Sequence, residues 1–86
     1  MTTYRIVLAS RARKNLARID PVIRRRIVRA IDALSADPQP VGCVPLKGVP
    51  GALRIRVGDY RVVYQVMHDD LEVLVADIDH RKDIYR

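Results

Sequence analysis

A two-residue turn between two strand-like segments constrains this chain more than any other feature of its sequence. Residues 53–57 alternate apolar and arginine side chains, Gly58-Asp59 follows, and residues 60–67 resume an alternating pattern. A two-residue loop with glycine first joins antiparallel strands and fixes their pairing register. We therefore predict a hairpin in which Arg56 lies directly opposite Arg61.

Periodicity and turn residues predict the elements before this hairpin. Residues 4–8 alternate in a way that is typical of a strand. Ser10 is expected to cap a short helix that runs to about Ile19. Asp20-Pro21 predicts a second helix, with aspartate as N-cap and proline in the first turn. This helix should end near Ala36, because the prolines that follow cannot continue it.

The rest of the chain completes one small domain over residues 1–86. Residues 37–52 are rich in proline and glycine and predict a loop, and residues 71–78 predict a last strand. The order is therefore β-α-α-β-β-β. We expect an α+β fold in which a helical hairpin packs on one face of a mainly antiparallel four-stranded sheet.

Charge and composition narrow the classes of function. The 86 residues include 16 basic and 10 acidic side chains, and thirteen of the basic residues are arginine, which binds phosphate bidentately. This balance suggests a polyanion or an acidic protein as partner, or a charge that serves solubility alone. One cysteine and two histidines argue against disulfides and structural zinc, so we expect no metal or cofactor. With no signal peptide or membrane span in view, we expect a cytoplasmic protein without membrane contact.

The predicted hairpin gathers three arginines on one face of the sheet. Arg56 and Arg61 are cross-strand neighbours, and Arg54 shares their face. Guanidinium groups in this arrangement repel one another unless an anion lies between them. The sequence therefore favours a site for a phosphate or an acidic partner. The alternative is that carboxylates of the last strand, such as Glu72 or Asp77, neutralise the arginines.

Other candidate residues are more isolated. Residues 79–86 directly follow the last predicted strand, so we expect this tail at the sheet edge beside the three arginines. In it, His80 can exchange a proton near neutral pH and Tyr85 could stack on an exposed base, although both residue types often only pack. Lys47 could reach a phosphate from its loop. Arg24 and Arg25 could contact an RNA backbone, or they could form an ordinary solvated helix face.

Three segments resemble a known family. They are LKG at 46–48, LRIRVGDYRVVY at 53–64 and HRKDIY at 80–85. Together they look like the RelE branch of the RelE/ParE toxin superfamily, and the resemblance extends over nearly the whole chain. It implies the toxin of a type II toxin–antitoxin pair and a RelE-like fold.

The resemblance also implies an activity and partners. RelE-like toxins are ribosome-dependent endoribonucleases (mRNA interferases). They enter the ribosomal A site and cut mRNA without a metal, by attack of a 2′-hydroxyl on the adjacent phosphate. The expected partners are the ribosome, mRNA and a cognate RelB-like antitoxin. The toxin–antitoxin complex would be hetero-tetrameric and would bind operator DNA through the antitoxin.

The family positions map onto individual residues of this sequence. Arg61 matches the arginine that stabilises the phosphate, and Arg81 matches the one that supports the transition state and leaving group. Tyr85 matches the terminal tyrosine that stacks on or orients mRNA. Arg54 and Arg56 stand at two basic strand positions that are lysines in the best-known RelE.

These two arginines depart from the family pattern in a way that matters. Arginine keeps its proton, so Arg54 is a poor general base. His80 is the obvious substitute as acid or base, and Lys82 adds a further basic contact for RNA. Two alternatives remain: a ParE-like protein that blocks DNA gyrase without cutting RNA, and an inactive module that only binds an antitoxin.

Overall fold

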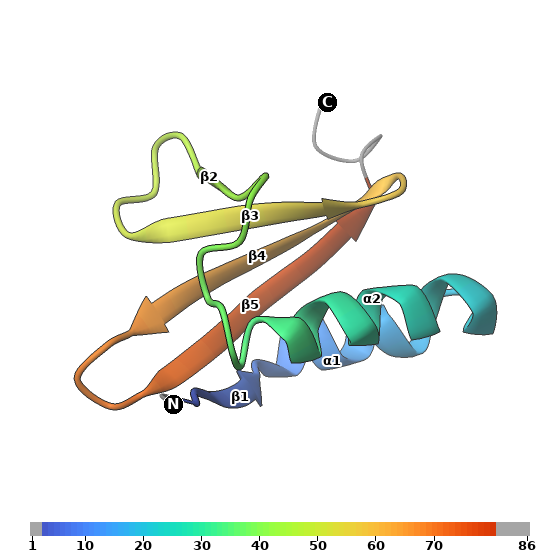
Figure 1. Ribbon diagram of the computed structural model, residues 1–86. Helices are drawn as coiled ribbons and strands as arrows, with labels where there is room; N and C mark the ends of the chain where they lie inside the picture. Colours follow the sequence, from blue (N-terminus) through green and yellow to red (C-terminus); the bar gives the residue numbers. More distant parts are fainter. Residues whose placement is uncertain (1–2, 81–86) are drawn as a thin grey trace.

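Two helices pack on one side of a five-stranded sheet (Figure 1). The computed structural model describes residues 3–80. Its elements are β1 (Arg5–Leu8), α1 (Ser10–Ala17), α2 (Pro21–Ala33), β2 (Val44–Pro45), β3 (Ala52–Val57), β4 (Tyr60–Met67) and β5 (Glu72–His80). The predicted α+β class is confirmed. Neither helix in this part of the chain is both long enough and apolar enough to cross a bilayer.

The strands are arranged in the order β1-β5-β4-β3-β2. β1 pairs with β5 in parallel, and all other neighbouring strands are antiparallel. This agrees with the predicted mainly antiparallel sheet. The sheet has one strand more than predicted, because β2 forms inside the segment 37–52 that was expected to be a loop. Two residues are too few for periodicity to show, and Pro45 is tolerated because β2 is an edge strand.

The hairpin between β3 and β4 has the predicted register. Val57 pairs with Tyr60 and Arg56 with Arg61. Gly58 has a φ angle of 60°, a left-handed conformation that glycine adopts without steric cost. The turn therefore explains why glycine comes first in the loop.

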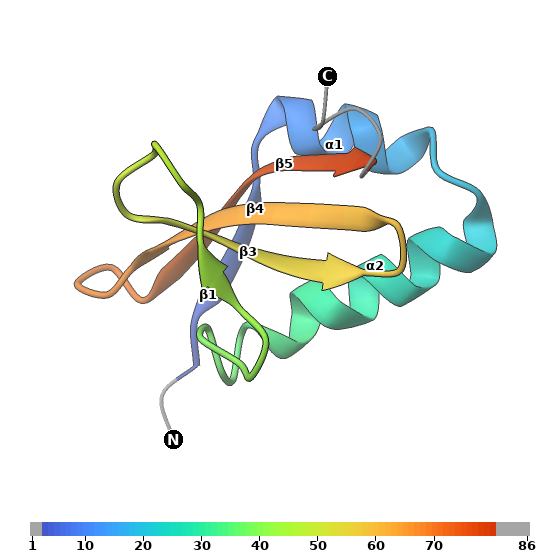
Figure 2. The ribbon, with the colours of Figure 1, turned by 90° about the horizontal axis from the view of Figure 1, so that it is seen from above.

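The core lies between the helices and the sheet. Its buried side chains come from both helices, the loop after each helix and three strands: Ala12, Leu16, Ile19, Ile27, Ile31, Leu34, Ile55, Val57, Val62, Tyr64, Val73, Val75 and Ile78. Figure 2 shows α1 alongside β5 and α2 toward β3. The hydroxyl of Tyr64 donates a hydrogen bond to the carbonyl oxygen of Pro38 at 2.8 Å, and burial raises its pKa.

The helix C-termini differ from the predictions by two and three residues. α1 ends at Ala17 rather than Ile19, and α2 ends at Ala33 rather than near Ala36. In both cases the chain continues through tight i→i−3 hydrogen bonds, such as that from the amide of Ile19 to the carbonyl of Leu16. Such 3₁₀-type turns keep the apolar spacing after the α-helix has ended.

The two predicted helix caps have different outcomes. The prediction for Asp20 is confirmed, because its carboxylate accepts a hydrogen bond from the amide of Val22 at 3.2 Å. The prediction for Ser10 is wrong, because Ala9 occupies the N-cap position and makes no side-chain bond. The amide of Ala9 is held by the carbonyl of Val75 at 2.9 Å, so β5 fixes where the chain leaves β1 and enters α1.

Candidate functional site

Three arginines share the face of the sheet that is turned away from the helices. Ile55 and Val57 are buried toward the core, so Arg54 and Arg56, which alternate with them on β3, point the other way. Arg61 joins them from β4, directly opposite Arg56. Arg56 is exposed, and the other two are half-buried. We call these three residues the arginine face.

The carboxylate of Glu72 does not neutralise the arginine face. Its Oε2 lies 2.6 Å from Nη2 of Arg5, on the neighbouring strand β1. This contact raises the pKa of the Arg5 guanidinium. In the β4–β5 ladder, Glu72 pairs with Met67, the last residue of β4. It therefore lies at the end of the sheet opposite to Tyr60 and Arg61.

The carboxylate of Asp77 is also engaged elsewhere. A bulge lets Tyr64 pair with Val75 and Val63 with Asp77, which leaves one extra residue in β5. The Asp77 carboxylate accepts hydrogen bonds from Nδ2 of Asn15 at 2.8 Å and from its neighbouring amide at 2.9 Å, and it lies 3.3 Å from Nε of Arg11. The alternative considered for the arginines, that Glu72 or Asp77 neutralises them, is therefore not what the structure shows.

The arginine face therefore keeps an excess of positive charge. Within residues 3–80, no ion pair joins any of its three guanidinium groups to a carboxylate. The ladder places Asp79 across from Arg61 on the other side of β4. The Nε atom of Arg61 is buried and has no hydrogen-bond partner in the described chain. A buried donor of this kind suits an acceptor that arrives with a ligand.

His80 lies on the other side of the sheet. It pairs with Tyr60, and the two rings meet edge to face, with centroids 5.0 Å apart and an angle of 89° between their planes. Tyr60 precedes Arg61 in β4, so their side chains point to opposite faces. The structure therefore does not bring His80 onto the arginine face, contrary to the sequence-based expectation.

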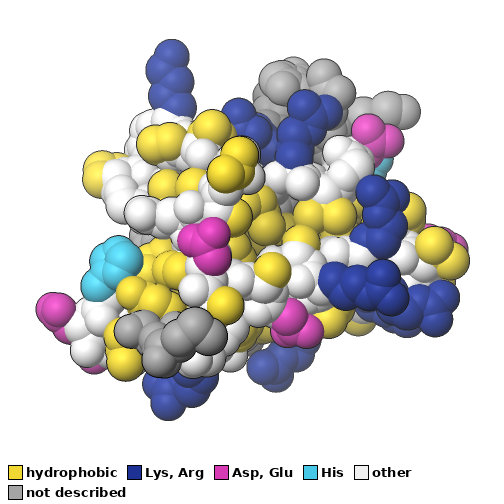
Figure 3. Space-filling view, viewed as in Figure 1, with side chains coloured by type: hydrophobic (Ala, Val, Ile, Leu, Met, Phe, Trp, Pro, Cys, Tyr) yellow, Lys and Arg dark blue, Asp and Glu magenta, His cyan; other side chains and the backbone are white. Residues whose placement is uncertain are grey.

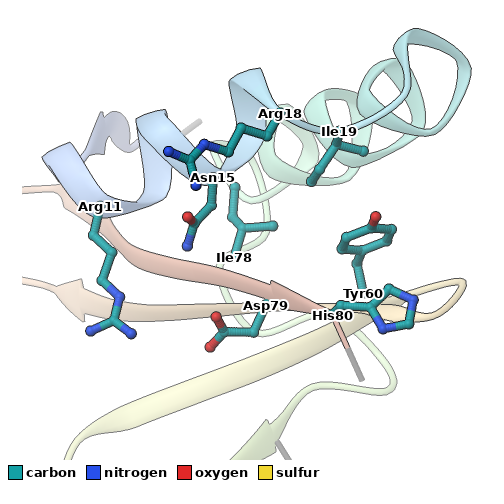
Figure 4. A pocket seen from close by; sticks show the side chains of 8 residues that line it. All are labelled: Arg11, Asn15, Arg18, Ile19, Tyr60, Ile78, Asp79 and His80. Atoms are coloured by element: carbon teal, nitrogen blue, oxygen red, sulfur yellow. The ribbon is translucent and has the colours of Figure 1, made fainter. Parts of the chain in front are cut away.

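Tyr60 and His80 line a groove between α1 and the end of β5. The groove has a volume of about 420 Å³. Figure 4 shows the eight residues that line it, four from α1 and the turn after it, three from the end of β5 and one from β4. They are Arg11, Asn15, Arg18, Ile19, Ile78, Asp79, His80 and Tyr60. We call this feature the α1–β5 groove.

Comparisons with known proteins agree with this architecture. A family model described as the ParE toxin of the type II toxin–antitoxin system parDE matches residues 6–85. The chain belongs to the RelE/ParE toxin superfamily. Toxin RelG of Mycobacterium tuberculosis is 32% identical over 84 residues, which cover 96% of this chain and 97% of RelG. Within the superfamily, this chain is RelE-like.

Solved structures of RelE-like proteins have the same fold. The RelBE2 toxin–antitoxin complex of M. tuberculosis contains a chain that is 28% identical, with a TM-score of 0.80 over 92% of this chain and 99% of that one. The RelE–RelB complex of Pyrococcus horikoshii contains a chain that is 29% identical, also with a TM-score of 0.80, over 94% and 97%. An Escherichia coli RelE mutant at 22% identity shows the fold alone, with a TM-score of 0.78 over 96% of this chain and 90% of that one.

The other residues that the RelE resemblance or the charge pattern singled out have different surroundings. Arg24 donates from Nη1 to the carbonyl of Ala17 at 3.3 Å, so it fastens α2 to the end of α1. Arg25 and Lys47 are exposed, on α2 and in the loop between β2 and β3. Figure 3 shows Lys and Arg side chains gathered at the end of the toxin where α2 begins. Three further candidates lie outside the described residues: Arg81, Lys82 and Tyr85.

Sequence reasoning missed the polar side of the α1–β5 groove in this RelE-like chain. Arg11, Asn15 and Arg18 recur at i, i+4 and i+7, which places them on one side of α1. That spacing was available in the sequence, next to the apolar positions of the same helix. The bulge in β5 and the position of α1 beside this strand were not, and both are needed to form the groove.

Proposed function

We propose that this chain is a toxin that cleaves mRNA in the ribosomal A site and that a RelB-like antitoxin neutralises it. The observation that carries the proposal is the arginine face, whose guanidinium groups have no carboxylate partner in the described chain. Membership of the RelE-like branch supports the same function. Action on the ribosome would place the protein in the cytoplasm.

The reaction attributed to this site is an internal transesterification. The 2′-hydroxyl oxygen of one nucleotide bonds to the adjacent phosphorus, and the bond from phosphorus to the 5′-oxygen of the next nucleotide breaks. The products are a cyclic phosphate and a 5′-hydroxyl. Negative charge grows on the phosphate oxygens in the transition state, and guanidinium groups fixed beside them stabilise it.

The described residues suit the part of this reaction that needs positive charge. Arg61 is half-buried and has an Nε donor without a partner among residues 3–80, so it is suited to hold a phosphate oxygen. Arg56 and Arg54 follow along β3 and would hold neighbouring phosphates of the same strand. These contacts would keep the 2′-oxygen in line with the bond that breaks.

The arginine face holds the phosphate but does not move the protons. In the proposal, water takes the proton of the 2′-hydroxyl and returns one to the leaving 5′-oxygen. Arginine cannot lose a proton at physiological pH, and His80 points to the opposite side of the sheet. We therefore do not assign His80 to proton transfer on this face. In the proposal, Arg81 supports the leaving oxygen and Tyr85 stacks on the mRNA, as the family pattern implies for these positions.

The proposed partner is an antitoxin with an acidic or amphipathic segment. The M. tuberculosis and P. horikoshii relatives were solved as complexes with their antitoxins. A segment that covers the arginine face would neutralise its charge and block access to RNA. Its affinity should fall as the salt concentration rises, because counter-ions screen exposed charges.

Primer extension on an mRNA in a translating extract tests the proposal. The wild-type chain should produce cuts within A-site codons only when ribosomes are present. Arg61→Ala and Arg81→Ala should abolish the cuts, whereas Arg13→Ala, which removes an exposed arginine from α1, should preserve them. Circular dichroism would show whether each variant is folded. Wild-type cutting by a folded Arg61→Ala variant would contradict the assignment of the arginine face.

Inhibition of DNA gyrase is the second candidate, because the matching family model is that of ParE toxins. It predicts growth arrest without new mRNA ends. A supercoiling assay with purified gyrase would then show inhibition by the wild-type chain. Growth arrest with neither effect would leave both functions unsupported.

A further inference from the structure

The α1–β5 groove lies on the side of the sheet opposite the arginine face, and the proposed reaction does not use it. We propose that it binds one nucleotide of single-stranded RNA, next to the segment that the arginine face holds. The proposal rests on the proposed function in that it takes RNA as the substrate. The groove volume of about 420 Å³ is within the range of small-ligand sites.

Arg18 is the side chain suited to the phosphate. Arg11 and Asn15 also face the groove, but both are anchored to the Asp77 carboxylate, at 3.3 and 2.8 Å. Arg18 is exposed, and no carboxylate within residues 3–80 forms an ion pair with it. The Asp77 contacts therefore fix α1 against β5, while Arg18, one turn beyond Asn15, keeps its guanidinium available.

Aromatic and apolar side chains, together with Asp79, form the rest of the groove. Tyr60 and His80 stand edge to face at a centroid distance of 5.0 Å. Ile19 and Ile78, which are 7% and 2% exposed, also line the groove. A nucleobase can stack on an aromatic ring and cover apolar surface while its phosphate meets a guanidinium group. A carboxylate from a protein partner would use Arg18 but not this aromatic pair, so the lining favours a nucleotide.

The position of the groove explains how one RNA strand could occupy both sites. Tyr60 and Arg61 are consecutive residues of β4 that point to opposite faces, so the groove and the arginine face meet at the same end of this strand. His80 ends β5 at the same place, across from Tyr60. An RNA strand that passes over this end of the sheet can contact Arg61 on one side and the groove on the other.

Fluorescence anisotropy with a short RNA tests the proposal. The RNA carries 2′-deoxy nucleotides so that it cannot be cut, and the full-length chain is used without ribosomes. Arg18→Ala should weaken binding roughly fivefold or more and lower the slope of affinity against salt by about one. Tyr60→Leu should weaken binding by a similar factor without changing the slope. Arg13→Ala removes the same charge from the same helix and should change affinity less than about twofold.

An NMR titration of the wild-type chain with adenosine monophosphate identifies the site directly. Amide shifts should concentrate at residues 15–19, 60 and 78–80. Tyr60→Phe keeps the aromatic ring and should bind as the wild type does, which separates stacking from a loss of folding in Tyr60→Leu. The proposal is overturned if Arg18→Ala binds RNA as Arg13→Ala does. It is also overturned if an acidic antitoxin peptide shifts the groove amides and the nucleotide does not.

The outcomes also separate this proposal from the proposed function. Binding of uncut RNA in the groove requires no cleavage. Groove binding together with an absence of cuts in primer extension would leave the groove proposal standing and refute the proposed reaction. If neither Arg18→Ala nor Tyr60→Leu changed A-site cutting or RNA affinity, the proposed reaction would stand and the groove proposal would be refuted.

Discussion

Replacing Arg61 should stabilise the fold while it removes the proposed activity. Arg56 and Arg61 are directly opposite each other, and like charges in such pairs cost about 0.2–1 kcal/mol. The buried Nε of Arg61 lacks a partner in the described chain, and such a donor costs about 1–3 kcal/mol. Asp79, across from Arg61 on β5, offsets part of this cost. Arg61→Met keeps an unbranched stem and should raise the free energy of unfolding by about 1 kcal/mol.

Urea denaturation followed by circular dichroism measures this difference. Arg61→Met should have a higher urea midpoint than the wild type at low salt. The difference between the two midpoints should become smaller at high salt, because salt screens the repulsion between Arg56 and Arg61. Arg13→Met, at an exposed position of α1, should stay within about 0.5 kcal/mol of the wild type. A lower midpoint for Arg61→Met than for the wild type at low salt would refute the argument that Arg61 destabilises the folded chain.

Three further substitutions test contacts in the described fold. Tyr64→Phe loses the bond to Pro38 and should cost about 1 kcal/mol in urea denaturation. The pKa of Tyr64 is raised in the folded state, so the wild type should lose stability as the pH rises above about 10. Tyr64→Phe should lose less stability over the same range, and parallel pH profiles of the two proteins would contradict this. Asp77→Ala should lower the free energy of unfolding by about 2–4 kcal/mol in thermal unfolding. Asp77→Asn keeps an acceptor for Asn15 and should lower it by about 1 kcal/mol. Equal losses would argue against the bonds to the Asp77 carboxylate. Asp20→Ala should cost about 1 kcal/mol in the same assay, and an unchanged midpoint would show that this cap is dispensable.

Local signals in the sequence were sufficient for most of the fold. The glycine at position 58 and the alternation around it determine the β3–β4 register, so the placement of the arginine face could be predicted. Asp20-Pro21 marks the start of α2 for a local reason, because the cap and the first turn are adjacent. Ser10 failed as a cap because a distant residue, Val75, holds the chain at Ala9.

The candidate site was harder to predict where it depends on distant contacts. The bulge in β5 changes which residues oppose Val63 and Arg61, and alternation along a single strand cannot show it. The partners of Asp77 come from α1, some sixty residues earlier in the chain. The sequence therefore did not show that its carboxylate is engaged with α1 rather than with the arginines. His80 was expected beside the arginines because its segment follows the last predicted strand, but its pairing with Tyr60 turns it to the other face.

The position of β5 between β1 and β4 has a consequence for how the protein is made. β5 comes last among the described strands, yet it joins β1 to β4, and Arg5 pairs with Glu72 across most of the chain. Contacts between such distant residues slow folding, because a long loop must close before any of them forms. The native sheet therefore cannot assemble until residue 80 has been synthesised, because a shorter nascent chain lacks the strand that joins β1 to β4.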